Sequence, residues 1–182
     1  MALKSAIGKI TLAMKTLFVL RHAKSSWDDP DLADFERPLN HRGKSAAPFM
    51  GETMEREGLL PDVILSSPAV RARETARLAK ESGNLSADIQ HVEQIYEASP
   101  QTLRQIASGI DDRFRSAMIV GHNPGMEGFV RLLTGRSEPM PTASLAVIDL
   151  DITAWSEISG GHGSLRRLIR PKEEMKAIGK GR

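Results

Sequence analysis

Two histidines stand where apolar runs of the sequence end. The stretch TLFVLRHAKSSW (16–27) begins apolar and then places Arg21 beside His22. The stretch AMIVGHNPG (117–125) also begins apolar and presents His122 just before a predicted helix. In an open α/β sheet, ligands bind outside the carboxyl ends of the parallel strands. We therefore expect these three polar side chains to meet at one edge of a sheet.

A third stretch, DVILSSPAVRARETARLAK (62–80), predicts a strand followed by a helix with arginines in its first turns. Arg73, Arg77 and Lys80 follow an i, i+4, i+7 spacing, which predicts one solvated basic stripe. Arg71 lies about 200° around the helix from Arg73, so it belongs to a different face. It also lies near the helix N-terminus, where backbone N–H groups favour an anion. Arg71 is thus the better candidate for a pocket.

This set of side chains suits the chemistry of a tetrahedral oxyanion such as phosphate. Two guanidinium groups match the fork geometry of phosphate oxygens. A histidine among them can attack phosphorus if it is neutral, and positive neighbours lower its pKa and keep it neutral. Water would then hydrolyse the resulting phosphohistidine. The arginines would stabilise the charge on the equatorial oxygens, so neither a metal nor another cofactor is expected.

The stretches LFVLRHAKSS, SSPAVRARETA and VGHNPG, in this order, resemble the histidine phosphatase superfamily. The resemblance extends from about residue 16 to the strands after residue 145 and implies a phosphoglycerate mutase-like fold. It implies that His22 is the phosphorylated nucleophile. It also implies that Arg21, Arg71 and His122 complete a phosphate pocket in a metal-independent mechanism.

The sequence departs from the superfamily in one place and points to one branch within it. The usual tripeptide is Arg-His-Gly, and here alanine follows the histidine, as Ala23. The stretches RHAKSSW and ERPLNHRG, together with the short chain, resemble the SixA-type branch. Members of that branch act as phosphohistidine phosphatases on signalling phosphotransfer domains. The resemblance implies that the partner is a phosphohistidine-bearing signalling protein.

Two alternative functions stay open at this stage. One is a phosphatase or mutase for a small phosphorylated metabolite, although the short chain offers few insertions from which to build the lid of a mutase. The other is a phosphate-binding module without turnover. The presence of both His22 and His122 argues against the module, because binding alone would need only the arginines.

Further polar residues are candidates for the same site. A phosphomonoesterase must protonate an alkoxide leaving group, whereas imidazole needs little help to leave. The candidate acids are Glu97, Asp34 and Glu36. Glu97 follows a predicted strand and precedes a capped helix, which would place it at the same edge of the sheet as His22. There it could act as an acid or line the pocket. Lys24 and Ser26 lie just beyond the histidine and are candidates for contacting the substrate phosphate.

Apolar runs alternate with helical segments, which predicts an α/β protein. The expected fold is a three-layer α/β/α sandwich around a mainly parallel sheet, with antiparallel strands near the C-terminus. The predicted helices are 40–58, 68–82, 100–109 and 124–133. The predicted strands are 16–20, 62–65, 89–92, 117–120, 144–150, 152–158 and 165–169. Ser67, Ser99 and Asn123 each precede a proline and are predicted helix N-caps.

The organisation expected along the chain is a single histidine phosphatase domain over residues 14–171. A disordered extension is expected over residues 1–13, with Met14 as a candidate natural start, and a polar tail over 172–182. No apolar run approaches the length of a membrane span, so no membrane partner is expected.

The composition excludes several classes of function. The chain has 182 residues, of which 40% are hydrophobic and only 4% aromatic, so the core must consist mainly of aliphatic side chains. Lys and Arg number 25 against 23 Asp and Glu, a net charge of +2, which predicts no nucleic-acid partner. There is no cysteine, which excludes disulfides, thiolate metal sites and a cysteine nucleophile. This composition fits a cytoplasmic location.

Overall fold

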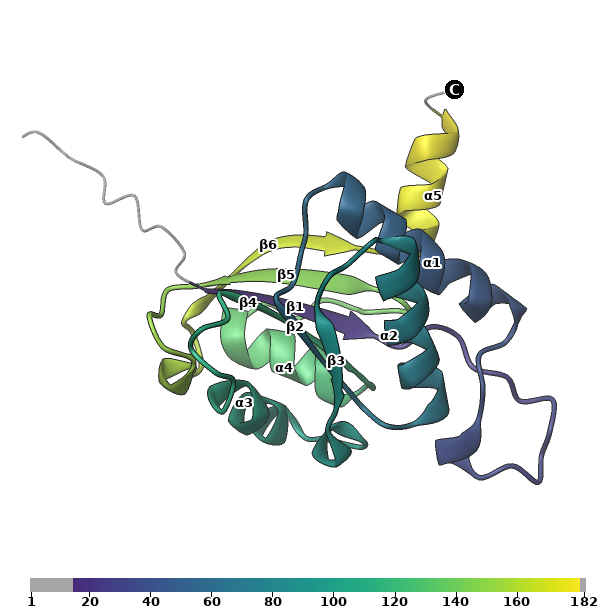
Figure 1. Ribbon diagram of the computed structural model, residues 1–182, viewed down its shortest axis with the longest axis horizontal. Coiled ribbons are helices and arrows are strands. Elements are labelled where there is room, and N and C mark those ends of the chain that lie inside the picture. Colours follow the sequence, from purple (N-terminus) through teal and green to yellow (C-terminus); the bar gives the residue numbers. More distant parts are fainter. Residues whose placement is uncertain (1–14, 181–182) are drawn as a thin grey trace, which may run out of the picture.

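A six-stranded sheet forms the centre of the molecule, as the computed structural model, which describes residues 15–180, shows (Figure 1). The strands are β1 (Lys15–Arg21), β2 (Val63–Ser66), β3 (Asp88–His91), β4 (Ser116–Gly121), β5 (Leu145–Leu150) and β6 (Gly163–Ile169). The α-helices are α1 (His41–Arg56), α2 (Val70–Ser82), α3 (Pro100–Ser108), α4 (Gly125–Thr134) and α5 (Pro171–Lys180). Three short 3-10 helices are η1 (Asp34–Glu36), η2 (Glu93–Ile95) and η3 (Trp155–Glu157).

The sheet is mainly parallel, and its strand order is β3–β2–β4–β1–β5–β6. The first four strands in this order pair in parallel. Strand β5 is antiparallel to β1, and β6 is antiparallel to β5. This confirms the predicted mainly parallel sheet with antiparallel strands near the C-terminus. Because β1 and β4 are neighbours in the middle, their carboxyl ends lie side by side.

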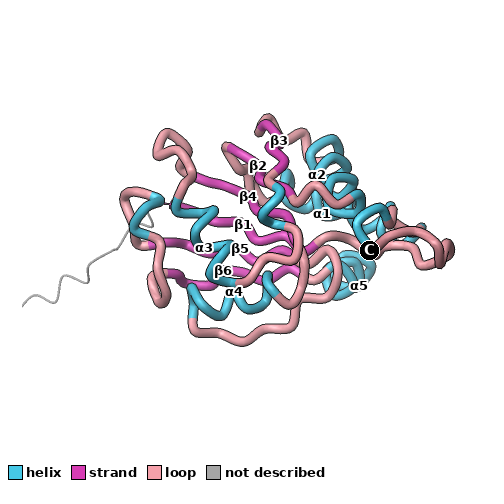
Figure 2. Tube along the Cα trace, turned by 90° about the horizontal axis from the view of Figure 1, so that it is seen from below, coloured by secondary structure: helices cyan, strands magenta, loops and turns pink. Residues whose placement is uncertain are grey.

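Helices cover both faces of the sheet, which confirms the three-layer prediction (Figure 2). Successive side chains of a strand point to opposite faces. Leu17 and Val19 of β1 belong to the core beneath α3 and α4. Phe18 and Leu20 belong to the core beneath α1 and α2. Strand β1 is therefore buried on both faces, and its polar residues are confined to its ends.

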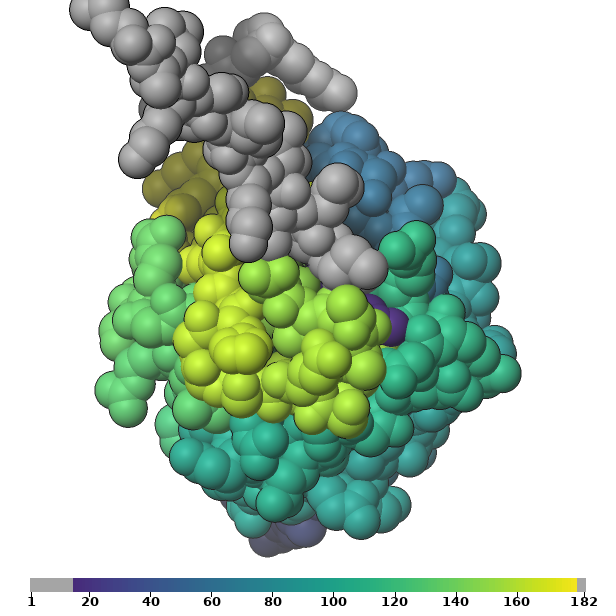
Figure 3. Space-filling view, turned by 90° about the vertical axis from the view of Figure 1, so that its left-hand side faces the viewer, coloured from purple at the N-terminus to yellow at the C-terminus, as the bar shows by residue number. Residues whose placement is uncertain are grey.

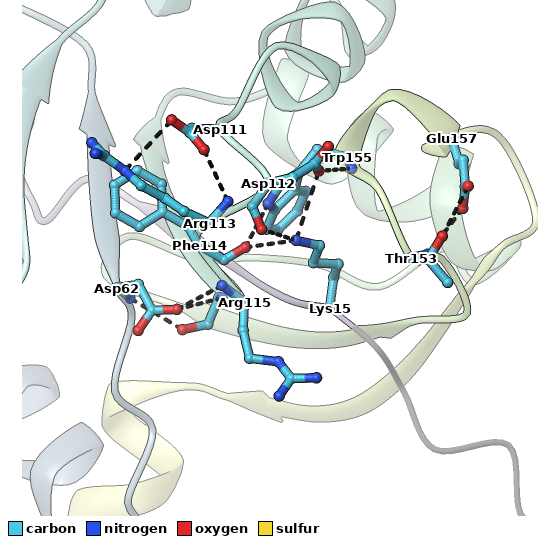
Figure 4. Close-up of polar contacts among 11 residues, drawn as sticks. Lys15, Asp62, Asp111, Asp112, Arg113, Phe114, Arg115, Thr153, Trp155 and Glu157 are labelled. Carbon is cyan, nitrogen blue, oxygen red and sulfur yellow. Dashed lines mark hydrogen bonds and ion pairs between the residues drawn. The ribbon is translucent and has the colours of Figure 1, made fainter.

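One predicted strand, 152–158, is wrong, because this segment contains the 3-10 helix η3 instead. The backbone N–H of Trp155 donates to the carboxylate of Asp112 at 2.7 Å. The indole Nε1 donates to the carbonyl of Phe114 at 2.9 Å (Figure 4). Trp155 is fully buried, so its tight anchoring to the 111–114 loop replaces the hydrogen bonds of a strand.

Two of the three predicted helix caps are also wrong. Ser99 caps α3 as expected, since its hydroxyl accepts the backbone N–H of Thr102 at 3.1 Å. Helix α2 begins later than predicted, with Ala69 at its N-cap and no side-chain cap. Helix α4 likewise begins after Pro124 without a side-chain cap. Ser67 and Asn123 are thus free for other contacts, which are described with the site.

The C-terminal residues 171–180 form helix α5, which lies beside α1 (Figure 1). The sequence predicted only a polar tail over 172–182. The expectations for residues 1–13 and for Met14 lie outside the described residues, and the domain limits stay predictions. Within residues 15–180, no helix has the length and apolar character that crossing a membrane requires.

A buried lysine closes the end of the sheet where β1 begins. The Lys15 side chain is 5% exposed, and its Nζ donates to the carbonyls of Asp112 and Phe114 at 2.8 Å each. It also lies 5.5 Å from the ring centre of Trp155. Figure 3 faces this end and shows the segments around residues 110 and 155 side by side over it. The network joins these loops to β1, at the end opposite Arg21.

We predict that Lys15→Met destabilises the protein by about 1–2 kcal/mol, because the partly buried Asp112 carbonyl loses its donor and the Phe114 carbonyl keeps only the Trp155 indole N–H. The free energy of unfolding in urea measures this change. The exposed Lys44 provides the control, and Lys44→Met should change stability by less than about 0.5 kcal/mol. Equal stability of the two variants would contradict the proposed role of Lys15.

Candidate active site

The carboxyl ends of β1 and β4 bring two histidines together. Arg21 pairs in register with Gly121, and the backbone N–H of His22 donates to the Gly121 carbonyl at 3.0 Å. His122 directly follows Gly121, the last residue of β4. The ring centres of His22 and His122 are 5.0 Å apart, with the ring planes tilted by 49°. The parallel pairing of two strands thus sets the separation of the two imidazoles.

The imidazole of His22 is buried, neutral and held in one tautomer. Its Nδ1 lies 2.7 Å from the carbonyl of Ala23, which can only accept, so Nδ1 carries the proton and Nε2 keeps its lone pair. Burial lowers the pKa of His22 from 6.5 to about 3. The hydrogen bond to Ala23 opposes this shift, whereas His122 and two nearby arginines reinforce it. The ring therefore presents a free nitrogen lone pair at neutral pH.

His122 is positioned by Ser67, which sequence analysis placed only as a helix cap. The Ser67 hydroxyl lies 2.8 Å from Nε2 of His122 and accepts the backbone N–H of Ala69 at 3.3 Å. When this hydroxyl donates to Nε2, the proton of the neutral His122 ring is on Nδ1. Nδ1 is buried and has no hydrogen-bond partner within residues 15–180. In that tautomer the buried Nδ1–H is a donor that an anionic oxygen can satisfy.

The pKa of His122 is also depressed. Burial lowers it from 6.5 to about 4, and the charge of Arg71 adds to the effect. The carboxylate of Asp34 acts in the opposite direction. Both imidazoles are consequently uncharged at neutral pH, and the positive charge of the site resides on its arginines.

Arg71 is buried, with a side chain 8% exposed, and it is held by Asp34. Its Nη1 donates to the Asp34 carbonyl at 2.6 Å and its Nη2 to the Asp34 carboxylate at 2.9 Å. The Tyr96 hydroxyl donates to the same carboxylate at 2.8 Å. Partial burial favours the neutral acid, but the hydrogen bonds from Tyr96 and Arg71 and the charge of Arg37 outweigh it and hold the pKa of Asp34 below its usual value. Asp34 is therefore a carboxylate that orients Arg71.

Arg21 is anchored from the other side of the site. Its Nη1 donates to the carbonyl of Met140 at 2.8 Å. The backbone N–H of Met140 in turn donates to Glu127, which also accepts from the amide of Asn123 at 2.7 Å. This chain of hydrogen bonds explains why Asn123 does not cap α4. The Nε of Arg21 is buried without a partner in the described chain, so the guanidinium keeps a free donor.

A cavity of about 780 Å³ opens at this edge of the sheet, and Asp34, Arg71, Glu97 and His122 line it. Glu97 is exposed and has a φ of 54°, in the left-handed region that few non-glycine residues adopt. Its loop lies so close to α4 that a Cβ at Gly125 would be 2.1 Å from the carbonyl oxygen of Ala98. The backbone of this loop is thus fixed while the Glu97 side chain lies on the cavity wall.

The other predicted residues lie elsewhere. Lys24 is exposed and lines a separate groove between α1 and α5. The Ser26 hydroxyl donates to the carboxylate of Asp28 at 2.8 Å. Glu36 is exposed in η1, next to Asp34, and does not line the cavity. Substrate contacts of Lys24 and Ser26 stay predictions. Within the described chain, no group of three or more His, Asp or Glu side chains is arranged to hold a metal ion.

Two residues that contact the site were missed by sequence analysis. Ser67 precedes a proline and therefore looked like an ordinary cap, and its bond to His122 spans 55 positions. Tyr96 stands next to Glu97, but its contact with Asp34 depends on the packing of two loops that are 62 positions apart. Its ring also meets that of His122 edge-on, with centres 5.5 Å apart.

Known proteins match this chain over most of its length. Residues 17–106, which include Arg21, His22 and Arg71, match the family described as the histidine phosphatase superfamily (branch 1). An uncharacterised chloroplastic protein of Arabidopsis thaliana is 32% identical over 93% of this chain and 84% of the plant protein. The structure of the putative phosphohistidine phosphatase SixA from Agrobacterium tumefaciens is 31% identical, with a TM-score of 0.74, over 86% of this chain and 98% of that one. A structure of the protein histidine phosphatase SixA complexed with tungstate, 20% identical, shares the fold with a TM-score of 0.71 over 87% of this chain and 99% of that one.

The depressed histidine pKa values predict a loss of stability in acid. Between about pH 6.5 and pH 3 the unfolded chain binds a proton at His22 that the folded chain does not, so stability falls as the pH falls through this window. From pH 7 to pH 5 the loss should be about 2 kcal/mol for each such histidine. We expect His22→Asn to lose about 2 kcal/mol less than the native protein over this interval, measured by urea unfolding at both pH values.

The exposed His91 provides the matched control. His91→Asn should show the same pH dependence as the native protein. An unchanged pH dependence in His22→Asn would contradict the buried, neutral state of His22.

Proposed function

The chain belongs to the histidine phosphatase superfamily, in its SixA-type branch, and on this basis we propose that it removes the phosphoryl group from phosphohistidine in a protein, through a covalent intermediate on His22. One observation carries the proposal. Nδ1 of His22 is committed to the Ala23 carbonyl, so a single unprotonated nitrogen, Nε2, is available beside two arginines and a second imidazole.

The proposed reaction has two displacements at phosphorus. In the first, the lone pair on Nε2 of His22 forms a bond to phosphorus while the P–N bond of the substrate breaks. The substrate ring enters protonated and leaves as neutral imidazole. In the second, water attacks the phosphorus of the enzyme phosphohistidine, the new P–N bond breaks, and phosphate departs with the water's proton going to solvent. His22 is then neutral again.

Three groups of the site stabilise the transferred phosphoryl group in this proposal. The free N–H donors of Arg21 and Arg71 would bind its equatorial oxygens, where charge is concentrated in the transition state. With the Ser67 hydroxyl donating to Nε2 of His122, the Nδ1 of that ring would carry a proton and, having no partner in the described chain, would donate a further hydrogen bond. Because Asp34 already fixes the plane of the Arg71 guanidinium, little ordering would remain to be done when the phosphoryl group arrives.

The carboxylates of the cavity favour phosphohistidine over phosphate esters. An alkoxide leaving group needs a proton donor at neutral pH, and Asp34 is held ionised by Tyr96 and Arg71. Glu97, the other carboxylate on the cavity wall, is exposed to solvent. Imidazole leaves without such a donor. A cavity of about 780 Å³ is also large enough for a side chain offered from the surface of another protein.

The covalent intermediate is tested by rapid acid-free quenching with a ³²P-labelled phosphohistidine peptide in the presence of EDTA. We expect label on the native protein that is stable in base and labile in acid, and no label on His22→Asn. The kcat/KM of His22→Asn should fall by about 10³-fold or more. The control His91→Asn should label like the native protein. Labelling of His22→Asn, or activity within tenfold of native, would contradict His22 as the nucleophile.

Substrate preference is tested with peptides carrying phosphohistidine or phosphoserine and with a sugar phosphate. We expect kcat/KM for phosphohistidine to be highest by about 10²-fold, which is a usual contribution of the missing general acid. Glu97→Gln should change the phosphohistidine rate less than threefold. A faster sugar phosphate reaction that loses about 10²-fold in Glu97→Gln would instead support a metabolite phosphatase with Glu97 as its acid.

A further inference from the structure

A second groove, of about 490 Å³, lies between α1, the start of α5 and the segment that precedes β5. Figure 1 shows α5 projecting beside α1 at this corner of the molecule. Nothing in the proposed chemistry uses this groove. One of its lining residues, Lys24, nevertheless lies only two positions after His22 in the sequence.

The groove carries an excess of positive charge. The cationic side chains that line it are Lys24, Arg42, Arg170 and Lys172, with His41 beside them. The carboxylate of Glu173 also lines the groove, but it pairs with Arg170 at 3.5 Å. Lys24, Arg42 and Lys172 are exposed and have no ion-pair partner within residues 15–180, so three positive charges remain to attract a ligand.

Apolar surface lies among these charges. Ala46, Pro141, Pro171 and Met175 line the same groove, and Met175 is 39% exposed. Ile178, one turn farther along α5, is 41% exposed. This apolar surface would add nothing to the binding free energy of an inorganic anion. A polypeptide segment with acidic and aliphatic side chains would satisfy both the charges and the apolar surface.

The position of the groove connects it to the transfer of a phosphoryl group. Pro141 and Thr142 line it, between Met140 and Ala143. Met140 accepts a hydrogen bond from Arg21, and the backbone N–H of Ala143 donates to the carbonyls of Arg21 and His22. A partner bound in the groove would therefore lie on the rim next to the nucleophile.

We propose that this groove, lined by Lys24, Arg42 and Lys172, docks an acidic segment of the phosphorylated protein on which the active site acts. The proposal rests on the proposed function, since it names the surface by which that protein is selected. Docking raises the local concentration of the phosphohistidine at the cavity without contributing to the chemical step.

Binding is measured by fluorescence anisotropy with an unphosphorylated, fluorescein-labelled peptide of alternating glutamate and leucine, so that the result does not depend on catalysis. The double variant Arg42→Glu, Lys172→Glu should weaken binding by about tenfold or more, because both changes place negative charges opposite the peptide. The control Arg73→Glu, Arg77→Glu reverses two exposed charges on α2 and should bind like the native protein. Equal binding by both double variants would overturn the proposal.

Turnover is measured with two phosphohistidine peptides that differ only in a flanking run of four glutamates or four serines. At low salt we expect kcat/KM of the native protein to be about tenfold higher for the glutamate peptide, and the advantage to vanish in 0.5 M NaCl. The variant Arg42→Glu, Lys172→Glu should lose the advantage yet keep its rate on N-acetylphosphohistidine amide, which is too small to reach the groove.

The outcomes separate the two proposals. Equal turnover of the two peptides by the native protein would overturn the docking groove and leave the proposed function standing. Binding that depends on the groove, without hydrolysis of either phosphohistidine peptide, would overturn the proposed function. Binding to phosphatidylserine vesicles that is lost in Arg42→Glu, Lys172→Glu, with no peptide binding, would assign the groove to a membrane surface and overturn the docking proposal.

Discussion

The hydrogen bond from Nδ1 of His22 to the carbonyl of Ala23 is the interaction on which the site depends. It fixes the tautomer of a ring whose burial already keeps it uncharged. The Ala23 backbone is held in turn, because its N–H donates to the hydroxyl of Thr75 at 2.9 Å. That hydroxyl donates to the carbonyl of Arg71 at 2.6 Å. One short chain of hydrogen bonds thus couples the candidate nucleophile to the helix that carries Arg71, the arginine proposed to bind phosphate.

The local backbone and packing accommodate alanine where the superfamily usually has glycine. The backbone of Ala23 lies outside the left-handed region, so glycine's conformational freedom is not needed there. Its methyl group is fully buried in the core beneath α1 and α2. The site combines uncharged imidazoles with permanently charged guanidiniums, and Asp34 balances Arg71 at the mouth of the cavity. In the proposed function, such a site would attract an anion and still offer a nucleophile that needs no deprotonation.

Sequence reasoning succeeded where local periodicity determines position. Strands that alternate with helices predicted a parallel sheet, and His22 and His122 follow two of its strands, so they were expected at the same edge, as observed. Helical geometry likewise separated the buried Arg71 from the exposed Arg73. It failed where a tertiary contact overrides the local pattern. The 152–158 segment was predicted as a strand because it follows β5 as a second short apolar run, yet the burial of Trp155 against the 111–114 loop makes it irregular. The contact between Ser67 and His122 joins segments that are far apart in the sequence, so no local sequence pattern predicts it.

Both His22 and His122 are uncharged at neutral pH, and the proton of His22 is on Nδ1. Long-range ¹H–¹⁵N NMR of the imidazole nitrogens measures this directly. At pH 7 we expect a protonated Nδ1 and an unprotonated Nε2 for His22 and an uncharged ring for His122, both unchanged down to about pH 5. An imidazolium spectrum for His22 at pH 7, or a proton on its Nε2, would contradict a neutral nucleophile with a free Nε2 lone pair.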